Sequence, residues 1–196
     1  DWLVGPEGGA FVEYSYKVVE DKNLLVTMAI FDVDGQAVLG VNKFHRQENA
    51  YDEHGNLIRT DYYGVDNARV KATAGYASLT HTYDGLNRLV ETCYYNVEEA
   101  LTKLVSGYAK VTYTYYGDGN RIHLETYFGA DGERTMLLQG YSSAEYEYGG
   151  DAFDLRITYY DIVDRRTMCM DGYARKEVVY TDVVVGQGYD AESDLQ

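Results

Sequence analysis

A short phrase, Gly-Tyr-Ala, recurs along the chain at nearly constant spacing, and this recurrence constrains the fold more than any other feature. Copies begin at Gly75, Gly107 and Gly172, and Gly140-Tyr141-Ser142 is a fourth, so the steps are 32, 33 and 32 residues. A tyrosine follows each of these glycines by eight residues, at Tyr83, Tyr115, Tyr148 and Tyr180. A fixed period of this length predicts stacked repeats, in which neighbouring units supply the core that one unit lacks.

Paired aromatic residues give a second landmark with the same period. The pairs are Tyr62-Tyr63, Tyr94-Tyr95, Tyr127-Phe128 and Tyr159-Tyr160, with Ile30-Phe31 as a degenerate first copy. We therefore predict one repeat array over residues 1–196, made of about six units, of which the first and last depart most from the pattern, as capping units do. The predicted units span approximately 8–42, 43–74, 75–106, 107–139, 140–171 and 172–196.

Apolar and polar residues alternate with a period of two inside each unit, which is typical of half-buried strands. After Gly107, the predicted faces are Ala109, Val111, Tyr113 and Tyr115 on one side, and Tyr108, Lys110, Thr112 and Thr114 on the other. A turn leads into a second strand, where Ile58, Thr60 and Tyr62 share a face. We expect the tyrosines equivalent to Tyr108 to cover a neighbouring unit from the polar face; they are Tyr76, Tyr141 and Tyr173.

Turn residues separate the predicted strands. Gly55 and Asn56 follow the first strand of their unit, and both residue types tolerate the positive φ that tight hairpins need. The unit at Tyr115 carries one extra residue, which we expect a β-bulge near residues 123–126 to absorb. No stretch shows sustained helical periodicity with caps. The fold class is therefore predicted to be all-β: a tandem array of β-hairpin repeats with a period of about 32 residues, stacked into an elongated, twisted, β-solenoid-like sheet.

Composition agrees with this fold and excludes several functions. The 22 Tyr suit half-buried strands, and 20 Gly with one Pro suit a chain that turns often. A formal net charge of -15 argues against nucleic acid and against anionic membrane surfaces, which need clustered Lys and Arg. No run approaches the about 18 apolar residues of a membrane span. Because the chain begins at Asp1 rather than Met, we interpret it as a processed or excised piece.

Several motifs resemble those of known repeat families. Tyr51-Asp52 through Leu57 and Tyr83-Asp84 through Leu89 are similar to the signature of YD repeats, also called Rhs repeats. The aromatic-plus-Asp-Gly pieces at 127–132 and 30–35 resemble hairpins of bacterial cell-wall-binding and glucan-binding repeats. The resemblance implies a secreted or surface-located bacterial protein whose array is a binding module, a stalk or a shell.

The outward member of each aromatic pair is the candidate ligand-binding residue. Consecutive strand residues point to opposite faces, so if the first member of each pair packs inward, the second points outward. The predicted outward set is Tyr63, Tyr95, Phe128 and Tyr160. Aromatic faces beside Asp, Asn and Gly suit sugars, and several weak contacts to one polymer reinforce one another. The alternative is that these rings stack as a scaffold with no ligand.

Other chemistry finds little support in the sequence. Turn aspartates such as Asp32, Asp34, Asp118 and Asp131 offer oxygen ligands for calcium, but no complete calcium loop is present, and Asp favours turns for backbone reasons. The four histidines do not share a repeat position, and Cys93 and Cys169 form neither a zinc pattern nor a redox pair. We expect both cysteines to be buried free thiols.

These observations predict a non-catalytic extracellular module without a cofactor or metal. Its expected partner is a cell-surface or extracellular polysaccharide, bound through the repeated Tyr and Phe side chains, with no nucleic acid and no membrane insertion. A purely structural stalk or a subunit that associates with itself into fibres is the second hypothesis. A shell segment of a larger Rhs-type protein is the third.

Overall fold

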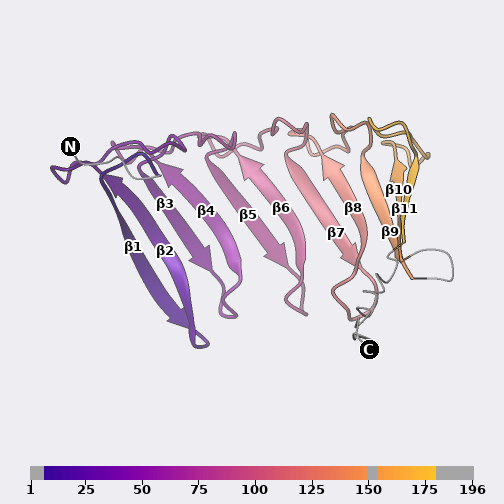
Figure 1. Ribbon diagram of the computed structural model, residues 1–196, viewed down its shortest axis with the longest axis horizontal. Helices are drawn as coiled ribbons and strands as arrows, with labels where there is room; N and C mark the ends of the chain where they lie inside the picture. Colours follow the sequence, from indigo (N-terminus) through magenta and orange to yellow (C-terminus); the bar gives the residue numbers. More distant parts are fainter. Residues whose placement is uncertain (1–6, 150–153, 180–196) are drawn as a thin grey trace, which may run out of the picture.

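The computed structural model describes residues 7–149 and 154–179, which form a single sheet of 11 antiparallel strands. The strands follow the order of the sequence, so each one pairs with its chain neighbours (Figure 1). They are β1 (Phe11–Val19), β2 (Lys22–Phe31), β3 (Arg46–Tyr51), β4 (Leu57–Tyr63), β5 (Ser78–Tyr83), β6 (Leu89–Tyr95), β7 (Lys110–Tyr115), β8 (Ile122–Phe128), β9 (Ser143–Tyr148), β10 (Leu155–Tyr160) and β11 (Arg175–Val178). The all-β prediction is confirmed. Tyr180 and most of the predicted unit 172–196 lie outside the described residues.

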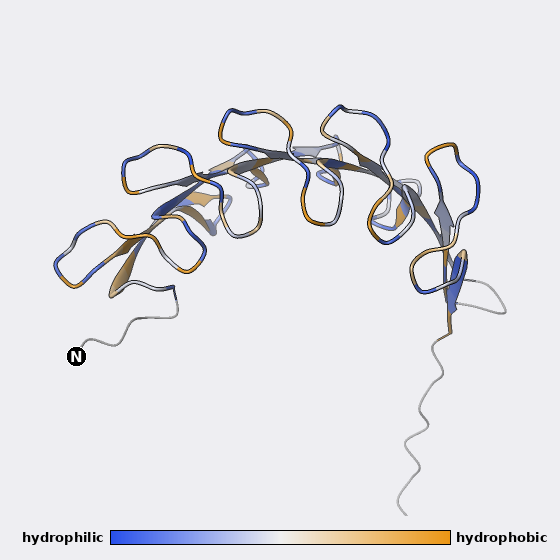
Figure 2. Cartoon of the chain, turned by 90° about the horizontal axis from the view of Figure 1, so that it is seen from above, coloured by the Kyte–Doolittle hydropathy of each residue, from blue (hydrophilic) through white to orange (hydrophobic). Residues whose placement is uncertain are grey.

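The sheet is open, with β1 and β11 as its edges. Short hairpin turns lie at one end of the strands and long connections at the other (Figure 1). Seen from above, the long connections loop out to both sides of the sheet (Figure 2). The described residues contain no helix, and therefore none of the length and apolar character that crossing a bilayer requires.

Aspartate shapes the tight hairpin turns. In the turn between β3 and β4, Asp52 Oδ1 accepts hydrogen bonds from the backbone N–H groups of His54 at 3.0 Å and Asn56 at 2.8 Å. Gly55 has a φ of 80° there, as the turn prediction required. Asp84 makes the equivalent pair of bonds in the turn between β5 and β6. The Tyr-Asp dipeptide therefore marks the point where a strand ends and such a turn begins.

The extra residue of the β7–β8 hairpin is placed differently from the prediction. A bulge does occur opposite His123, where Thr114 pairs with Leu124 and Tyr115 with Ile122. Equivalent register shifts, however, interrupt the β3–β4 and β5–β6 pairings, whose units carry no extra residue. The added residue instead lies in the turn. The turn between β7 and β8 spans 116–121, which is one residue more than the equivalent turn between β5 and β6 at 84–88. A turn absorbs an insertion without disturbing the ladder, so the strands keep their faces.

Strands pair completely inside each hairpin and only partly between hairpins. β5 pairs with β6 along its length, whereas only Arg59–Asp61 of β4 pairs with 78–80 of β5. We call this partial junction between hairpins a seam. Where the seam strands diverge, a tyrosine hydroxyl donates to a carbonyl of the preceding hairpin. These bonds are Tyr51 to Leu25 at 2.8 Å, Tyr83 to Leu57 at 3.0 Å and Tyr115 to Leu89 at 2.6 Å.

Each residue of the Gly-Tyr-Ala phrase has its own role in the long connections. The glycine adopts a positive φ, and at Gly140, with φ of 90°, an added Cβ would lie 3.0 Å from the carbonyl oxygen of Met168 in the next connection. Neighbouring connections also bond directly, as in the Thr73 N–H donating to the Asn42 carbonyl at 3.0 Å. The alanine, as at Ala109, is completely buried just before the strand. The phrase therefore recurs because the connections stack.

The buried core is small because no second layer covers the sheet in the described residues. Its main cluster is Ile30, Phe44 and Ala72, with Val12 and Tyr62 among the partly buried residues around it. Other fully buried apolar positions are mostly small, such as Ala77 and Ala144. Backbone pairing, ring contacts and seam bonds must therefore supply much of the stability that a layered domain obtains from its core.

Removing one seam hydroxyl tests this arrangement. Tyr83→Phe keeps the ring but leaves the Leu57 carbonyl without its donor, so we expect a loss of about 1 kcal/mol in the free energy of unfolding. Urea denaturation followed by circular dichroism measures it. Tyr14→Phe is the matched control, because Tyr14 is 51% exposed on β1, and it should change stability by less than about 0.5 kcal/mol. Equal effects of the two variants would contradict the seam role.

Candidate functional site

The two faces of the sheet carry different chemistry. One face holds Tyr62, Tyr94, Tyr127 and Tyr159, with apolar partners such as Leu79 opposite Tyr94 and Val111 opposite Tyr127. We call it the aromatic face. The other holds the candidate ligand-binding residues together with most of the ion pairs, and we call it the charged face. The aromatic pairs thus divide between the faces as strand alternation requires.

A continuous row of rings crosses the aromatic face from hairpin to hairpin. Successive ring centroids lie between 4.6 and 6.1 Å apart, within the range of favourable aromatic contacts. The row runs Phe44, Tyr62, Tyr76, Tyr94, Tyr108, Tyr127, Tyr141, Tyr159 and Tyr173. Every ring in it is at least partly solvent-accessible except Phe44, which is buried.

The tyrosines of the Gly-Tyr-Ala phrase lie on the other face from the one predicted. Tyr108 was expected beside Lys110 and Thr112, yet its ring lies between Tyr94 and Tyr127 on the aromatic face. The strand begins only at Lys110, and Gly107 with a φ of 103° turns the chain before it. The alternation of side-chain direction holds only within the strand and not through this turn. Extending it from Lys110 back to Tyr108 therefore assigned Tyr108 to the wrong face. These rings do contact a neighbouring hairpin, as expected, but they do so on the aromatic face, as Tyr108 does with Tyr94.

Burial raises the pKa of several tyrosines in the row. Desolvation is the main cause that raises the pKa of Tyr62 and Tyr94 well above its ordinary value, and it raises that of Tyr141 to about 12. Tyr127 is shifted furthest, by desolvation and then by Glu125, whose Oε2 accepts its hydroxyl at 2.7 Å. At neutral pH the row presents ring edges and uncharged hydroxyl groups, as tyrosine does with its ordinary pKa of about 10, and the shifts matter only at alkaline pH.

The four candidate ligand-binding residues occupy one repeated position on the charged face. Each follows the first member of its aromatic pair, and the residues directly opposite them are Arg46, Ser78, Lys110 and Ser143, respectively. They stand two strands apart, about 9–10 Å, and no ring contact joins any two of the four in the described part of the chain. They therefore form a spaced series of single rings rather than a touching ladder.

Basic side chains cover two of these rings. The Arg46 guanidinium lies 4.8 Å from the ring centroid of Tyr63, and the Lys110 Nζ lies 4.5 Å from that of Phe128. Both distances suit cation–π attraction. A ligand at these two positions would stack on a ring only by displacing the cation or by sharing it.

The other two rings present their hydroxyls to polar neighbours. The Tyr95 hydroxyl lies 3.4 Å from Thr80 Oγ1, and the Tyr160 hydroxyl donates to Glu145 Oε2 at 2.5 Å. Tyr160 also lines a cavity of about 240 Å³ with Leu124, Ser143, Glu145 and Asp164. Among the described residues, no Lys or Arg side chain lies over the rings of Tyr95 and Tyr160, in contrast to Tyr63 and Phe128.

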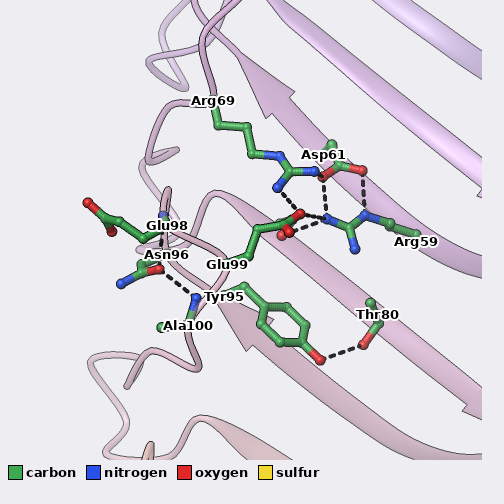
Figure 3. A network of polar contacts seen from close by, with 10 residues as sticks. Arg59, Asp61, Arg69, Thr80, Tyr95, Asn96, Glu98, Glu99 and Ala100 are labelled. Atoms are coloured by element: carbon green, nitrogen blue, oxygen red, sulfur yellow. Dashed lines mark hydrogen bonds and ion pairs between the residues drawn. The ribbon is translucent and has the colours of Figure 1, made fainter.

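An ion-pair network bridges the β4–β5 seam on the charged face (Figure 3). Asp61, only 8% exposed, accepts a bidentate pair of bonds from Arg59 at 2.7 and 2.8 Å, and Arg69 approaches it at 3.0 Å. Glu99, from the next connection, contacts both guanidinium groups. The hydrogen bond from Arg69 is the main cause that lowers the pKa of Glu99. The network links β4, the connection that follows it and the connection between β6 and β7.

Other seams carry ion pairs of the same kind. Glu91 on β6 pairs with Lys110 on β7 at 3.3 Å, and Arg156 on β10 pairs with Glu177 on β11 at 2.9 Å. Sequence analysis missed these groups as a set. The signal was present in the opposite charges two residues apart in strands, such as Arg46 with Glu48 and Arg59 with Asp61, which period-two alternation places on one face.

The remaining candidate groups serve the backbone or are buried. Asp32 Oδ1 accepts the N–H groups of Asp34 and Gln36, so its carboxylate shapes a turn. No three His, Cys, Asp or Glu side chains converge as a metal site within residues 7–149 and 154–179. Cys93 and Cys169 are buried and free, as predicted, and burial raises the pKa of the Cys93 thiol. Because the thiolate is the reactive form of cysteine, a buried thiol with a raised pKa is a poor nucleophile.

Comparison with known proteins adds no family to this picture. No protein-family model matches the chain, and a search of curated proteins found no significant similarity. The likeness to YD and wall-binding repeats therefore rests on the short motifs themselves, and function must be argued from the sheet and its two faces.

The seam network gives a prediction about stability. Asp61→Asn leaves Arg59 and Arg69 facing each other with only the exposed Glu99 between them, so we expect a loss of about 2 kcal/mol in the free energy of unfolding. Urea denaturation measures the change. Glu48→Gln removes a carboxylate from an exposed pair with Arg46 and should cost less than about 0.5 kcal/mol. If Asp61→Asn is equally mild, the network is not a structural bridge.

The tyrosine row predicts a loss of stability at alkaline pH. Tyr141 in the row, and Tyr113 on the same face of the sheet as Val111, have pKa values raised to about 12, against about 10 in an unfolded chain. Between these values the unfolded state binds fewer protons, so stability is fully present below about pH 10 and falls as pH rises through about 12. Tyrosinate absorbance and circular dichroism should therefore change together in this range. Ionisation of the full tyrosine set near pH 10 with the sheet intact would contradict the shift.

Proposed function

We propose that this chain is a non-catalytic repeat module that binds a glycan of a cell surface or extracellular matrix through aromatic rings on its sheet. One observation carries the proposal: an open sheet presents Tyr63, Tyr95, Phe128 and Tyr160 at one repeated register position, each within reach of charged or hydroxyl groups. A regular series of this kind suits a polymer with a regular repeat, because each added contact becomes intramolecular once the first has formed.

Sugar is the ligand class that this surface fits best. The C–H groups of a sugar ring pack on an aromatic face, while neighbouring polar groups bond its hydroxyls. Tyr95 beside Thr80, and Tyr160 beside Glu145 and Ser143, supply such combinations. The formal net charge of -15 disfavours nucleic acid and anionic bilayers as alternative partners.

The unit structure of the array is part of the same proposal. The recurring phrase and the equivalent bridges between Tyr63 and Arg69, Tyr95 and Leu101, and Phe128 and Arg134 support about six stacked hairpin units with a period of about 32 residues. Such an array would extend its binding surface in proportion to its length. An extracellular or bacterial surface location, with the motif likeness to YD and wall-binding repeats, belongs to this interpretation.

A second candidate function, self-association into fibres, is favoured by the β1 edge. β1 has nine residues and pairs only with β2 in the described part of the chain. It exposes Tyr14 and Tyr16, which are 51% and 59% accessible, and Val18, which is 68% accessible. A long edge strand with exposed apolar groups is a template for pairing with another chain. A shell segment of a larger Rhs-type protein would use the same edges within one polypeptide.

A double variant tests the glycan proposal. Tyr95→Ala with Tyr160→Ala removes the two rings that no cation covers, so binding on a polysaccharide array should fall about tenfold or more, as expected from two aromatic contacts. Circular dichroism and the urea midpoint verify that the sheet persists. Tyr14→Ala with Tyr16→Ala is the matched control, because it removes two tyrosines outside the series.

The outcomes separate the candidates. Unchanged polysaccharide binding by the Tyr95 and Tyr160 variant, or no binding by the parent chain, would reject the glycan proposal. Light scattering of the parent chain at increasing concentration tests the second candidate. Growth that disappears in the Tyr14 and Tyr16 variant would show association through the β1 edge.

A further inference from the structure

The hairpin of β7 and β8 differs from the two hairpins before it, β3–β4 and β5–β6, at the first residue of its turn. The strand-ending tyrosines Tyr51 and Tyr83 are followed by the turn-shaping Asp52 and Asp84, whereas Tyr115 is followed by Tyr116. An aromatic residue cannot accept the turn's N–H groups as an aspartate does. The turn here is also one residue longer. β7–β8 therefore uses this turn position differently from the two hairpins that precede it, and the Tyr116 side chain makes its contacts outside its own turn.

Tyr116 crosses the next seam instead of shaping its own turn. Its hydroxyl donates to the backbone carbonyl of Tyr146 on β9 at 2.9 Å. In the three preceding seams the bond runs the other way, from the later hairpin's tyrosine back to the earlier hairpin. Tyr148, the equivalent tyrosine of the later hairpin, instead places its ring at 85° to that of Tyr116, with centroids 6.1 Å apart.

The two rings form the walls of a cavity of about 460 Å³. Tyr116, Arg121, Glu147, Tyr148 and Gly149 line it. This volume lies within the roughly 300–1,000 Å³ of small-molecule sites and accommodates one or two sugar rings. The Tyr116 ring also packs against His123 at 4.6 Å between centroids, which holds this wall in place. Ring walls and charged groups therefore line one cavity between the β7–β8 hairpin and β9.

The charges at the cavity favour an anionic group. Glu147 is already paired with Arg156 at 3.1 Å. The Arg121 guanidinium lies 5.3 Å from the ring centroid of Tyr148 and has no carboxylate partner among the described residues. Although the whole chain is acidic, charges farther than about 8–10 Å are largely screened at physiological salt, so the charged groups that line the cavity are Arg121 and the already paired Glu147. A guanidinium held over a ring is suited to bind a carboxylate through two hydrogen bonds.

We propose that this cavity binds a single sugar residue that carries a carboxylate, such as a uronic acid, with its ring against Tyr116 and Tyr148 and its carboxylate on Arg121. The inference rests on the proposed function only in taking the ligand to be a sugar. It adds a site distinct from the repeated series, since none of the cavity's lining residues belongs to that series. The site would give a repetitive array one position that recognises a charged residue or a chain end.

The test is an amide NMR titration of the purified chain with sodium D-glucuronate, with D-glucose as the neutral comparison. We expect shifts at residues 116–121 and 147–149, and a dissociation constant on the order of 1 mM for one charge-assisted contact with ring stacking. Glucose should bind about tenfold more weakly, because it lacks the carboxylate. Arg121→Gln should weaken glucuronate binding by a similar factor and leave glucose binding unchanged.

Arg165→Gln is the matched control, because it removes the same charge from an exposed arginine paired with Asp161, away from the cavity. Absence of glucuronate binding, equal binding of glucose, or no effect of Arg121→Gln would each overturn the inference. If these occur while the polysaccharide binding that depends on Tyr95 and Tyr160 persists, only the cavity site is rejected. Glucuronate bound at the cavity by a chain that binds no polysaccharide would support the site and reject the proposed function.

Discussion

The structure depends on how its hairpins are held to one another. Inside a hairpin the strands pair along their length, but at each seam only a short central stretch pairs, as with Arg59–Asp61 of β4. A sheet with no second layer in the described residues cannot compensate for weak seams with a shared core. Tyrosine hydroxyls, the ring row, ion pairs and stacked connections all act at these seams. The high tyrosine content follows from this need, because one residue type supplies ring contact and a hydrogen-bond donor together.

The two faces of the sheet differ in how their aromatic rings are packed. The ring row on the aromatic face is continuous, and burial raises the pKa of Tyr62 and Tyr94 within it. The rings on the charged face stand apart from one another and are half-exposed beside polar groups, which leaves them more suited to contact a partner. Tyr63 and Phe128 carry covering cations, while Tyr95 and Tyr160 do not. The repeated position therefore alternates along the sheet between a ring covered by a cation and a ring without one.

The β7–β8 hairpin shows that a turn in this sheet can change without a change in strand pairing. Replacing the turn aspartate by Tyr116 and lengthening the turn leaves the pairing of β7 and β8 intact, because the turn lies outside the ladder. The seam is still closed, with the direction of its hydroxyl bond reversed. Because Tyr116 makes the hydroxyl bond across this seam, neither Tyr148 nor Arg121 is needed for that bond. Turn positions are where such a scaffold tolerates change.

The sequence by itself determined the all-β class, the hairpin turns and the division of each aromatic pair between two faces. These follow from local rules: period-two alternation inside strands, and the backbone demands of Asp, Asn and Gly in turns. Only the tertiary structure decided that Tyr76 and Tyr108 join the aromatic face, that the extra residue lies in a turn, and that Arg59, Asp61, Arg69 and Glu99 meet. The physical reason is that alternation fixes side-chain direction only while the strand continues. Contacts across a seam depend instead on register and on the path of the connections, which bring together residues about 30–40 positions apart in the chain.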